Sequence, residues 1–223
     1  MGVVSFSIPR ELVLSFTQKH PIKYFVETGT FKGDSSIWAS QYFEKVYTIE
    51  IDETLHKNAS SRSDAPKNIT FVLGNSKDQL ANIVKEIDAP ALYWLDGHWC
   101  MGAGGKDHEC PLADELKAIQ PRQDSIILID DARCFLGKLP PPHNAEDWPR
   151  VDDVFKLFFE LFPQHQVTII QDVIVAFPKN MRQEVDNYWV KNFDNFYNER
   201  RKLEKISLYK LFKIKLLQLF SRK

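Results

Sequence analysis

The sequence predicts an α/β fold: a doubly wound, seven-stranded, mostly parallel sheet with an antiparallel last strand and helices on both faces. Two observations lead to this prediction. Apolar strand-like segments alternate with helical segments five times along the chain, which is typical of a parallel sheet. Two β-branched runs, residues 167–170 and 173–177, then flank Gln171 and Asp172, which predicts a terminal hairpin. Extra helices are expected at the C-terminus.

Each element has its own signal in the first half of the chain. Ser7 and Pro9 favour the start of a helix over residues 9–19. A short apolar strand over residues 23–26 then runs into a glycine turn. The next expected elements are a helix, a strand that ends at residue 50, a helix over residues 53–62, a strand over residues 69–73 and a helix over residues 77–87.

The second half continues the alternation. A strand over residues 91–95 precedes a glycine-rich loop and a helix over residues 112–119. Residues 125–129 form a continuous apolar run, which is typical of a central parallel strand. A proline-rich loop and a helix over residues 150–162 lead into the terminal hairpin.

Composition limits the class of protein. The chain has 223 residues, 43% of them hydrophobic, and a net charge of −1, so we expect a domain with its own core and no nucleic-acid partner. Three cysteines without disulfide-framework spacing favour a reducing compartment. Neither a signal peptide nor a membrane-spanning run is evident, so a cytoplasmic protein is expected. The domains expected are residues 1–180 and a helical extension, residues 181–223.

The first glycine turn indicates a nucleoside site. Gly29 and Gly33 allow a tight turn after the first strand, and Glu50 ends the second strand, where a carboxylate can accept both ribose hydroxyls. The turn lacks the second glycine of a dinucleotide fingerprint. Glu27, just before the turn, would repel phosphates but suits an α-amino group. S-adenosylmethionine has both an adenosine end and an amino-acid end and therefore fits best.

Four blocks in this order resemble the class I, Rossmann-like S-adenosylmethionine-dependent methyltransferases, and more narrowly the macrocin O-methyltransferase-like enzymes that methylate sugar hydroxyls. The resemblance covers roughly residues 21–178. The blocks are Val26-Glu27-Thr28-Gly29-Thr30-Phe31-x-Gly33, Ile49-Glu50, Leu95-Asp96-Gly97-His98 and Ile129-Asp130-Asp131.

The resemblance implies a role for each block. The first block would line the methionine end of the cofactor, Glu50 would hold the ribose, and the residues after the third strand would border the adenine. The expected cofactor-binding residues are Glu27, Gly29, Thr30, Phe31, Gly33, Ser35, Glu50, Ile51, Asn75, Ser76 and Asp96.

Three carboxylates and one histidine are the expected chemical groups. Asp96, Asp130 and Asp131 end two strands and offer oxygen donors suited to Mg²⁺ or Mn²⁺, which would lower the pKa of a bound sugar hydroxyl. His98 is the expected general base, with Asp96 as the second catalytic residue. The alternatives are a helix cap with a solvated neighbour for the aspartates, and a loop residue packed on Trp99 for His98.

Other features have weaker interpretations. His98, Cys100, His108 and Cys110 suggest zinc, but their spacing is not that of structural zinc sites, so the glycine-rich segment between them is better interpreted as a lid. Glu109 is most simply a solvated charge. Residues 205–223 carry six basic residues and no acid. They are consistent with a helix lying on an anionic membrane surface or packed in a homo-oligomer.

The leading hypothesis is a metal-assisted O-methyltransferase that uses S-adenosylmethionine and acts on a sugar or glycan hydroxyl. One alternative is an NAD-dependent oxidoreductase or epimerase, against which the missing glycine and the terminal hairpin count. The other is a non-catalytic, methyltransferase-like binding subunit.

Overall fold

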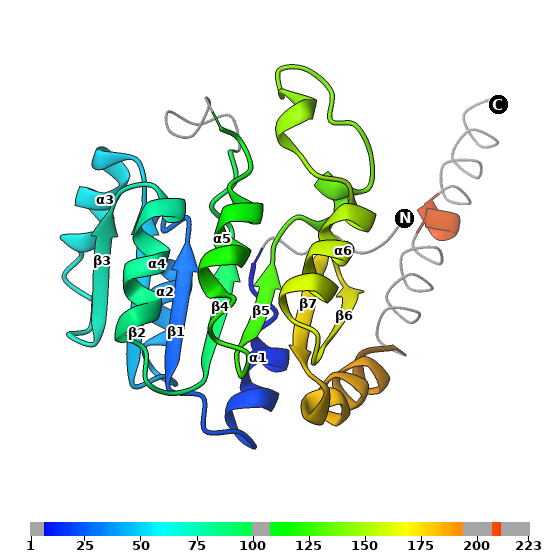
Figure 1. The fold of residues 1–223 in the computed structure, drawn as a ribbon, viewed down its shortest axis with the longest axis horizontal. Helices are drawn as coiled ribbons and strands as arrows, with labels where there is room; N and C mark the ends of the chain where they lie inside the picture. The colour runs from blue at the N-terminus through cyan, green and yellow to red at the C-terminus, as the bar shows by residue number, and fades with distance from the viewer. Residues whose placement is uncertain (1–6, 100–107, 194–206, 211–223) are drawn as a thin grey trace, which may run out of the picture. The chain divides into compact units, whose positions relative to one another are not determined.

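The computed structural model describes residues 7–99, 108–193 and 207–210. Its sheet has seven strands in the order β3-β2-β1-β4-β5-β7-β6 (Figure 1). The strands are β1 (Tyr24–Thr28), β2 (Lys45–Glu50), β3 (Ile69–Leu73), β4 (Ala91–Leu95), β5 (Ile126–Ile129), β6 (His165–Ile170) and β7 (Val173–Pro178).

The predicted fold class is confirmed. β1 pairs in parallel with β2 and β4, and the parallel pairing continues to β3 and β5 at either side. β7 is antiparallel to both β5 and β6, so the hairpin is present and its second strand lies inside the sheet. The turn of this hairpin, Gln171 and Asp172, has positive φ at both residues, as in a type I′ turn.

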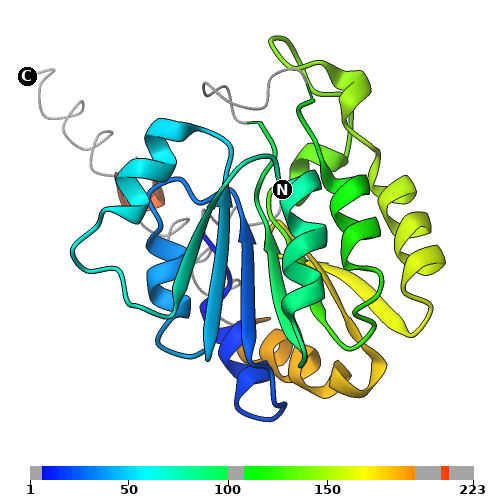
Figure 2. The ribbon, with the colours of Figure 1, turned by 60° about the vertical axis from the view of Figure 1, so that its left-hand side comes forward.

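Helices cover both faces of the sheet. α4, α5 and α6 lie side by side on one face, and α1, α2 and α3 lie on the other (Figures 1 and 2). The α-helices are α1 (Arg10–Thr17), α2 (Asp34–Ala39), α3 (Glu53–Ser60), α4 (Ser76–Glu86), α5 (Leu112–Ile119) and α6 (Val151–Leu161). Three short 3₁₀ helices are η1 (Ala132–Phe135), η2 (Ala145–Asp147) and η3 (Lys179–Met181).

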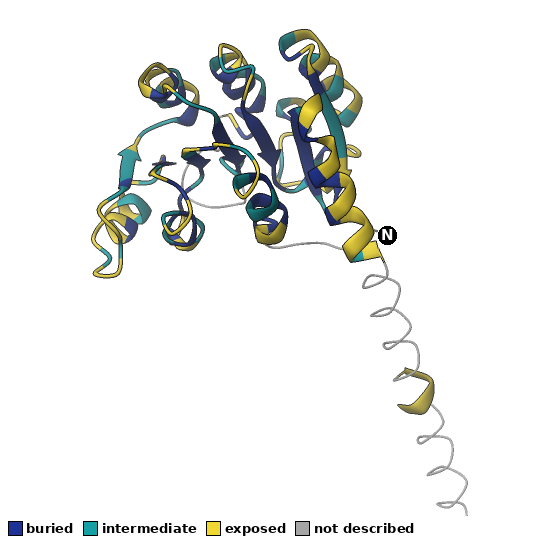
Figure 3. Cartoon of the chain, turned by 90° about the horizontal axis from the view of Figure 1, so that it is seen from below, coloured by how far each residue is buried: buried dark blue, intermediate teal, exposed yellow. Residues whose placement is uncertain are grey.

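The core lies between these layers. Every residue of β4 and β5 is buried, as expected for strands covered by helices on both faces (Figure 3). Trp94 and Tyr93 are the largest fully buried side chains. A rigid central sheet of this kind fixes the positions of the loops that follow its strands.

The chain divides into two compact units, Met1–Glu184 and Val185–Lys223. Residues 182–193 are helical, as are residues 207–210, where Leu208 and Tyr209 are exposed. The domain boundary expected after residue 180 stays a prediction. In the parts of the chain that the structure describes, no helix has the length and hydrophobicity needed to span a bilayer.

Candidate functional site

A cavity of about 270 Å³ lies at the carboxyl ends of the central strands, where parallel α/β sheets bind their ligands. The described residues around it come from the loops after β1, β2, β3 and β4. They are Gly29, Phe31, Ile49, Glu50, Ile51, Asp52, Leu55, Gly74, Asn75, Ser76, Asp96, Gly97, His98, Trp99, His108 and Pro111.

The glycine turn after β1 closes one side of this cavity. Gly29 has φ of 85°, and a Cβ there would stand 2.2 Å from the carbonyl oxygen of Asp96. Only glycine combines that backbone conformation with such a close approach to the loop after β4. The N–H of Gly29 donates to the carbonyl of Ile49 at 2.9 Å. The turn therefore joins the loops after β1, β2 and β4.

Glu50, the predicted ribose ligand, forms part of the cavity wall. It ends β2, lines the cavity and is 7% exposed. The N–H of Phe31 donates to its Oε2 at 2.8 Å, and the N–H of Asp52 donates to its Oε1 at 3.0 Å. Two backbone donors fix the carboxylate plane, and each oxygen keeps acceptor capacity for a ligand hydroxyl.

Glu27 lies beneath the turn rather than on the cavity wall. Its carboxylate is fully buried and accepts from Ser36 Oγ at 2.6 Å and from Thr48 Oγ1 at 2.8 Å. Burial outweighs these hydrogen bonds and raises the pKa of Glu27 to about 7. Glu27 thus ties β1 to α2 and β2 in the structure, and its contact with a cofactor stays a prediction.

The predicted cofactor residues fall into two groups. The cavity is lined by Gly29, Phe31, Glu50, Ile51, Asn75, Ser76 and Asp96, whereas Glu27, Thr30, Gly33 and Ser35 lie outside its lining. The lining residues that were not predicted are Ile49, Asp52, Leu55, Gly74, Gly97, Trp99, His108 and Pro111. Asp52 and Gly97 are direct neighbours of predicted residues, so the motif itself could have indicated them; His108 and Pro111 lie too far along the chain.

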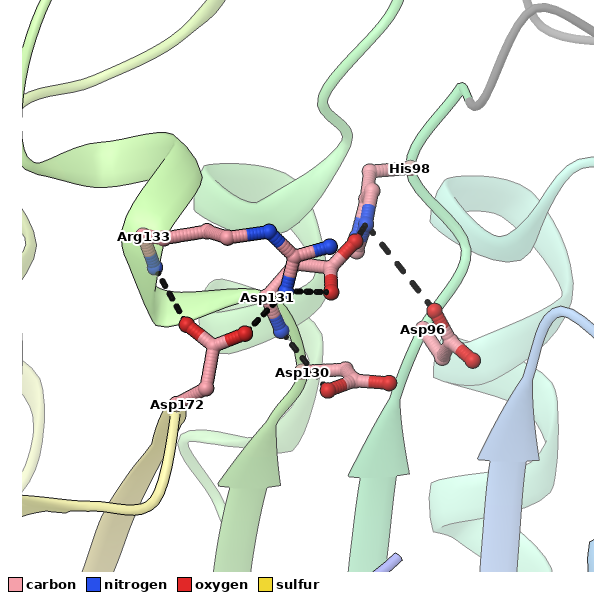
Figure 4. A network of polar contacts seen from close by, with 6 residues as sticks. All are labelled: Asp96, His98, Asp130, Asp131, Arg133 and Asp172. Atoms are coloured by element: carbon pink, nitrogen blue, oxygen red, sulfur yellow. Dashed lines mark hydrogen bonds and ion pairs between the residues drawn. The ribbon is translucent and has the colours of Figure 1, made fainter. Parts of the chain in front are cut away.

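His98 and Asp131 come together from the loops after β4 and β5 (Figure 4). His98 Nε2 lies 3.1 Å from Asp131 Oδ2 and 3.9 Å from Asp96 Oδ1. Arg133 Nη1 lies 2.6 Å from Asp131 Oδ1 and also contacts the Asp172 carboxylate. The N–H of Arg133 donates to Asp172 at 2.8 Å. Asp131 is therefore held between a histidine and an arginine anchored by the β6–β7 turn.

Charge coupling follows from this arrangement. Burial alone would lower the pKa of His98, but the hydrogen bond with Asp131 and the charge of Asp96 raise it. Burial alone would raise the pKa of Asp131, but His98 and Arg133 lower it. Asp131 is thus ionised beside a histidine that binds protons more tightly than usual.

The predicted metal site is not supported. Across residues 7–99, 108–193 and 207–210, no three or more His, Cys, Asp or Glu side chains are arranged to hold a metal ion. The reason is local. Asp131 has φ of 53°. The carboxylate of Asp131 points toward His98, whereas the carboxylate of Asp130 does not (Figure 4). Burial raises the pKa of Asp130 to about 6, and burial together with the charge of Asp130 raises that of Asp96.

Two weaker sequence interpretations also change. Cys110 is buried, and burial raises the pKa of its thiol to about 12, which disfavours the thiolate that zinc requires. Cys100 and most of the predicted lid, residues 100–107, lie outside the described residues. Glu109 is not a solvated charge, because only 2% of its surface is exposed.

Comparison with known proteins gives the class of fold. Neither protein-family models nor curated proteins match this chain. A solved caffeoyl-CoA O-methyltransferase candidate from Staphylococcus aureus has 15% identity and a TM-score of 0.57, over 78% of this chain and 86% of that one.

Two further structures contain S-adenosylhomocysteine. The protein SMU.1697c from Streptococcus mutans has 16% identity and a TM-score of 0.53, over 77% of this chain and 98% of that one. The methyltransferase PaMTH1 from Podospora anserina has 15% identity and a TM-score of 0.52, over 75% and 76% of the two chains. The chain therefore has the fold of the class I, S-adenosylmethionine-dependent methyltransferases. The likeness to the sugar-methylating branch stays a resemblance of sequence motifs.

Proposed function

We propose that this protein is an S-adenosylmethionine-dependent O-methyltransferase that methylates a hydroxyl of a sugar or glycan. The observation that carries this proposal is the His98–Asp131 pair, because it places a proton acceptor on the wall of the cavity that Glu50 and the glycine turn also form. The methyltransferase fold supports the cofactor. The sugar acceptor rests on the motif resemblance.

The chain's residues divide the cofactor-binding task by position. Glu50, with its carboxylate plane fixed by two backbone donors, accepts the ribose hydroxyls. Gly29 lets the backbone approach the amino-acid end of the cofactor, and Asn75 and Ser76 border its adenine. When bound, S-adenosylmethionine supplies a methyl group that is already activated by its sulfonium, so the protein needs mainly positioning and proton removal.

His98 removes the proton. We assign the Nε2–H of neutral His98 as donor to Asp131, which leaves Nδ1 with the lone pair that accepts the hydroxyl proton. Asp131 then stabilises the imidazolium and holds its orientation, in the way a carboxylate orients a catalytic histidine in other enzymes, and Arg133 holds Asp131 in place. No step is assigned to Mg²⁺ or Mn²⁺, since His98 and Arg133 already occupy both oxygens of Asp131.

Cofactor binding tests the first half of the proposal. We expect S-adenosylhomocysteine, and not NAD, to bind the full chain in calorimetry. Glu50→Ala should weaken that binding by about 1.5–3 kcal/mol, or roughly ten- to 150-fold, because a charged hydrogen-bonding group is lost. Glu53→Ala, at an exposed position outside the cavity lining, is the control. Unchanged affinity in Glu50→Ala would remove the ribose assignment, and preferential binding of NAD would favour the oxidoreductase.

Methyl transfer tests the second half. Labelled S-adenosylmethionine is offered with monosaccharides and glycan fragments, and with a phenol and an amine for comparison. His98→Gln should lower transfer to the best acceptor by about 100-fold or more while S-adenosylhomocysteine affinity stays unchanged. His20→Gln, in the turn after α1, is the control.

The same assay decides the metal. Turnover that persists in excess chelator leaves His98 as the base without a metal. Loss of turnover that Mg²⁺ restores would show that a divalent cation takes part in the reaction. Equal activity of wild type and His98→Gln would contradict the proposed base.

A further inference from the structure

The carboxylate of Glu109 joins two loops beside the proposed base. Glu109 lies in the segment that precedes α5, and only 2% of its surface is exposed. Its Oε2 accepts from Trp148 Nε1 at 2.8 Å and contacts His143 Nδ1 at 3.0 Å, and its Oε1 accepts from the N–H of Asn144 at 2.9 Å. Three partners from one loop thus converge on a single buried side chain.

The backbone of Glu109 extends the same connection. Its carbonyl accepts from the N–H of Trp99 at 2.7 Å, and its N–H donates to Asp147 Oδ2 at 3.2 Å. Trp99 directly follows His98 in the loop after β4. Glu109 therefore links that loop to residues 143–148, which lie more than thirty positions further along the chain.

One of the two rings that Glu109 contacts, the indole of Trp148, packs against His98. The indole of Trp148 lies edge-on to the His98 imidazole, with centroids 5.3 Å apart and planes at 67°. The His143 ring packs against Trp148 at 5.8 Å and against Trp99 at 5.3 Å. His98 accordingly has a carboxylate partner, Asp131, at Nε2, and an aromatic neighbour, Trp148, whose indole N–H donates to Glu109.

Glu109 is built to remain a charged acceptor. Burial alone would raise its pKa, but the hydrogen bonds from Asn144, Trp148 and His143 lower it. Hydrogen bonds to an ionised group are stronger than neutral ones, and the partners of a buried carboxylate are costly to lose.

We propose that Glu109 is a positioning residue: it holds the indole of Trp148 against His98 and so fixes the plane of the imidazole. What His98 does chemically rests on the proposed function, whereas the positioning itself does not. A purely structural brace would also explain a buried glutamate. The positioning role and the structural brace predict different results. If Glu109 positions His98, its loss changes the surroundings of His98 through Trp148, whereas loss of a brace lowers stability without that change.

Nuclear magnetic resonance of the full chain distinguishes them. The carbon-bound ring protons of His98, assigned by comparison with His98→Gln, sense the ring current of Trp148. Spectra are recorded at one pH above the titration of His98, so that the imidazole is neutral in every variant. Glu109→Ala and Trp148→Ala should displace these resonances in the same direction, and the double variant should displace them no further than Trp148→Ala alone.

Conservative variants keep the test decisive if an alanine variant fails to fold. Glu109→Gln retains one acceptor oxygen for Trp148, so its displacement should be smaller than that of Trp148→Phe, which loses the N–H donor. Glu160→Gln, at an exposed position of α6, should leave His98 unchanged. A lower melting temperature with His98 resonances at their wild-type positions in the Glu109 variants would overturn the proposal.

Calorimetry with S-adenosylhomocysteine on the same samples separates this inference from the proposed function. We expect the Glu109 variants to keep wild-type affinity, since Glu109 does not line the cavity. Absence of binding in the wild type would contradict the proposed function alone, and the His98 resonances would still decide the role of Glu109.

Discussion

Glu27 makes the stability of the protein depend on pH. Its folded-state pKa is raised from 4.5 to about 7 by burial. The folded protein therefore binds a proton more tightly than the unfolded chain does. The stabilisation from this group is complete below pH 4.5 and is lost as the pH rises through about 7.

Replacing Glu27 with glutamine should remove this dependence. The amide oxygen can still accept from Ser36 and Thr48, and no charge has to be buried. Relative to Glu27→Gln, the wild type should lose about 3 kcal/mol of unfolding free energy between pH 4 and pH 8. Urea unfolding at several pH values measures the difference. Parallel curves for the two proteins would mean that Glu27 is ionised without cost.

Some residues of the candidate site could be predicted from the sequence, and others could not. Glu50 was found because a carboxylate at the end of the second strand is a property of the motif, and the structure places it in the cavity wall. The direction of the Asp131 side chain depends on a positive φ that no sequence pattern predicts. Glu109 is buried by partners from residues 143–148, so its neighbouring residues in sequence made it look solvated.

At the scale of elements, the turn between β1 and α2 is the most constrained connection. Gly29→Ala would put a methyl group against the Asp96 carbonyl and force an unfavourable φ. Backbone strain should lower the free energy of unfolding by about 1–3 kcal/mol, and S-adenosylhomocysteine binding should be lost.

Gly137→Ala is the matched control for this change. A Cβ at Gly137 would meet nothing within 4 Å. Thermal unfolding and calorimetry of the two variants give the comparison. If Gly29→Ala were as stable as Gly137→Ala and bound the ligand equally well, the turn would not be the tight contact described here.

The elements themselves were largely predictable. The strand over residues 69–73 and the helix over residues 112–119 have the predicted bounds, because apolar periodicity and flanking turn residues mark them clearly. The place of β7 between β5 and β6 could not be derived from periodicity, since a β-branched run predicts a strand but not which strands it pairs with. The loop after β4 was predicted, but the contacts that bury Glu109 within it were not, because its partners come from the loop before α6.

At the scale of the whole molecule, the basic C-terminal residues can be tested as a unit. Deletion of residues 205–223 should leave S-adenosylhomocysteine affinity unchanged, because the described residues that line the cavity all lie between Gly29 and Pro111. The deletion should reduce sedimentation with anionic vesicles, or convert a dimer to a monomer in light scattering. Unfolding of the truncated protein would instead place the segment in the core.

The position of β7 has a consequence for synthesis on the ribosome. β6 is made before β7, but its sheet partner is β7 alone, so β6 has no edge to join until the last strand has been made. β6 can therefore join the sheet only with β7 or after it, once β7 pairs with β5. Asp172 arrives with them and anchors Arg133. A nascent chain released before that point would lack Asp172, so Arg133 would have lost one of the two carboxylates that hold it beside the proposed histidine base.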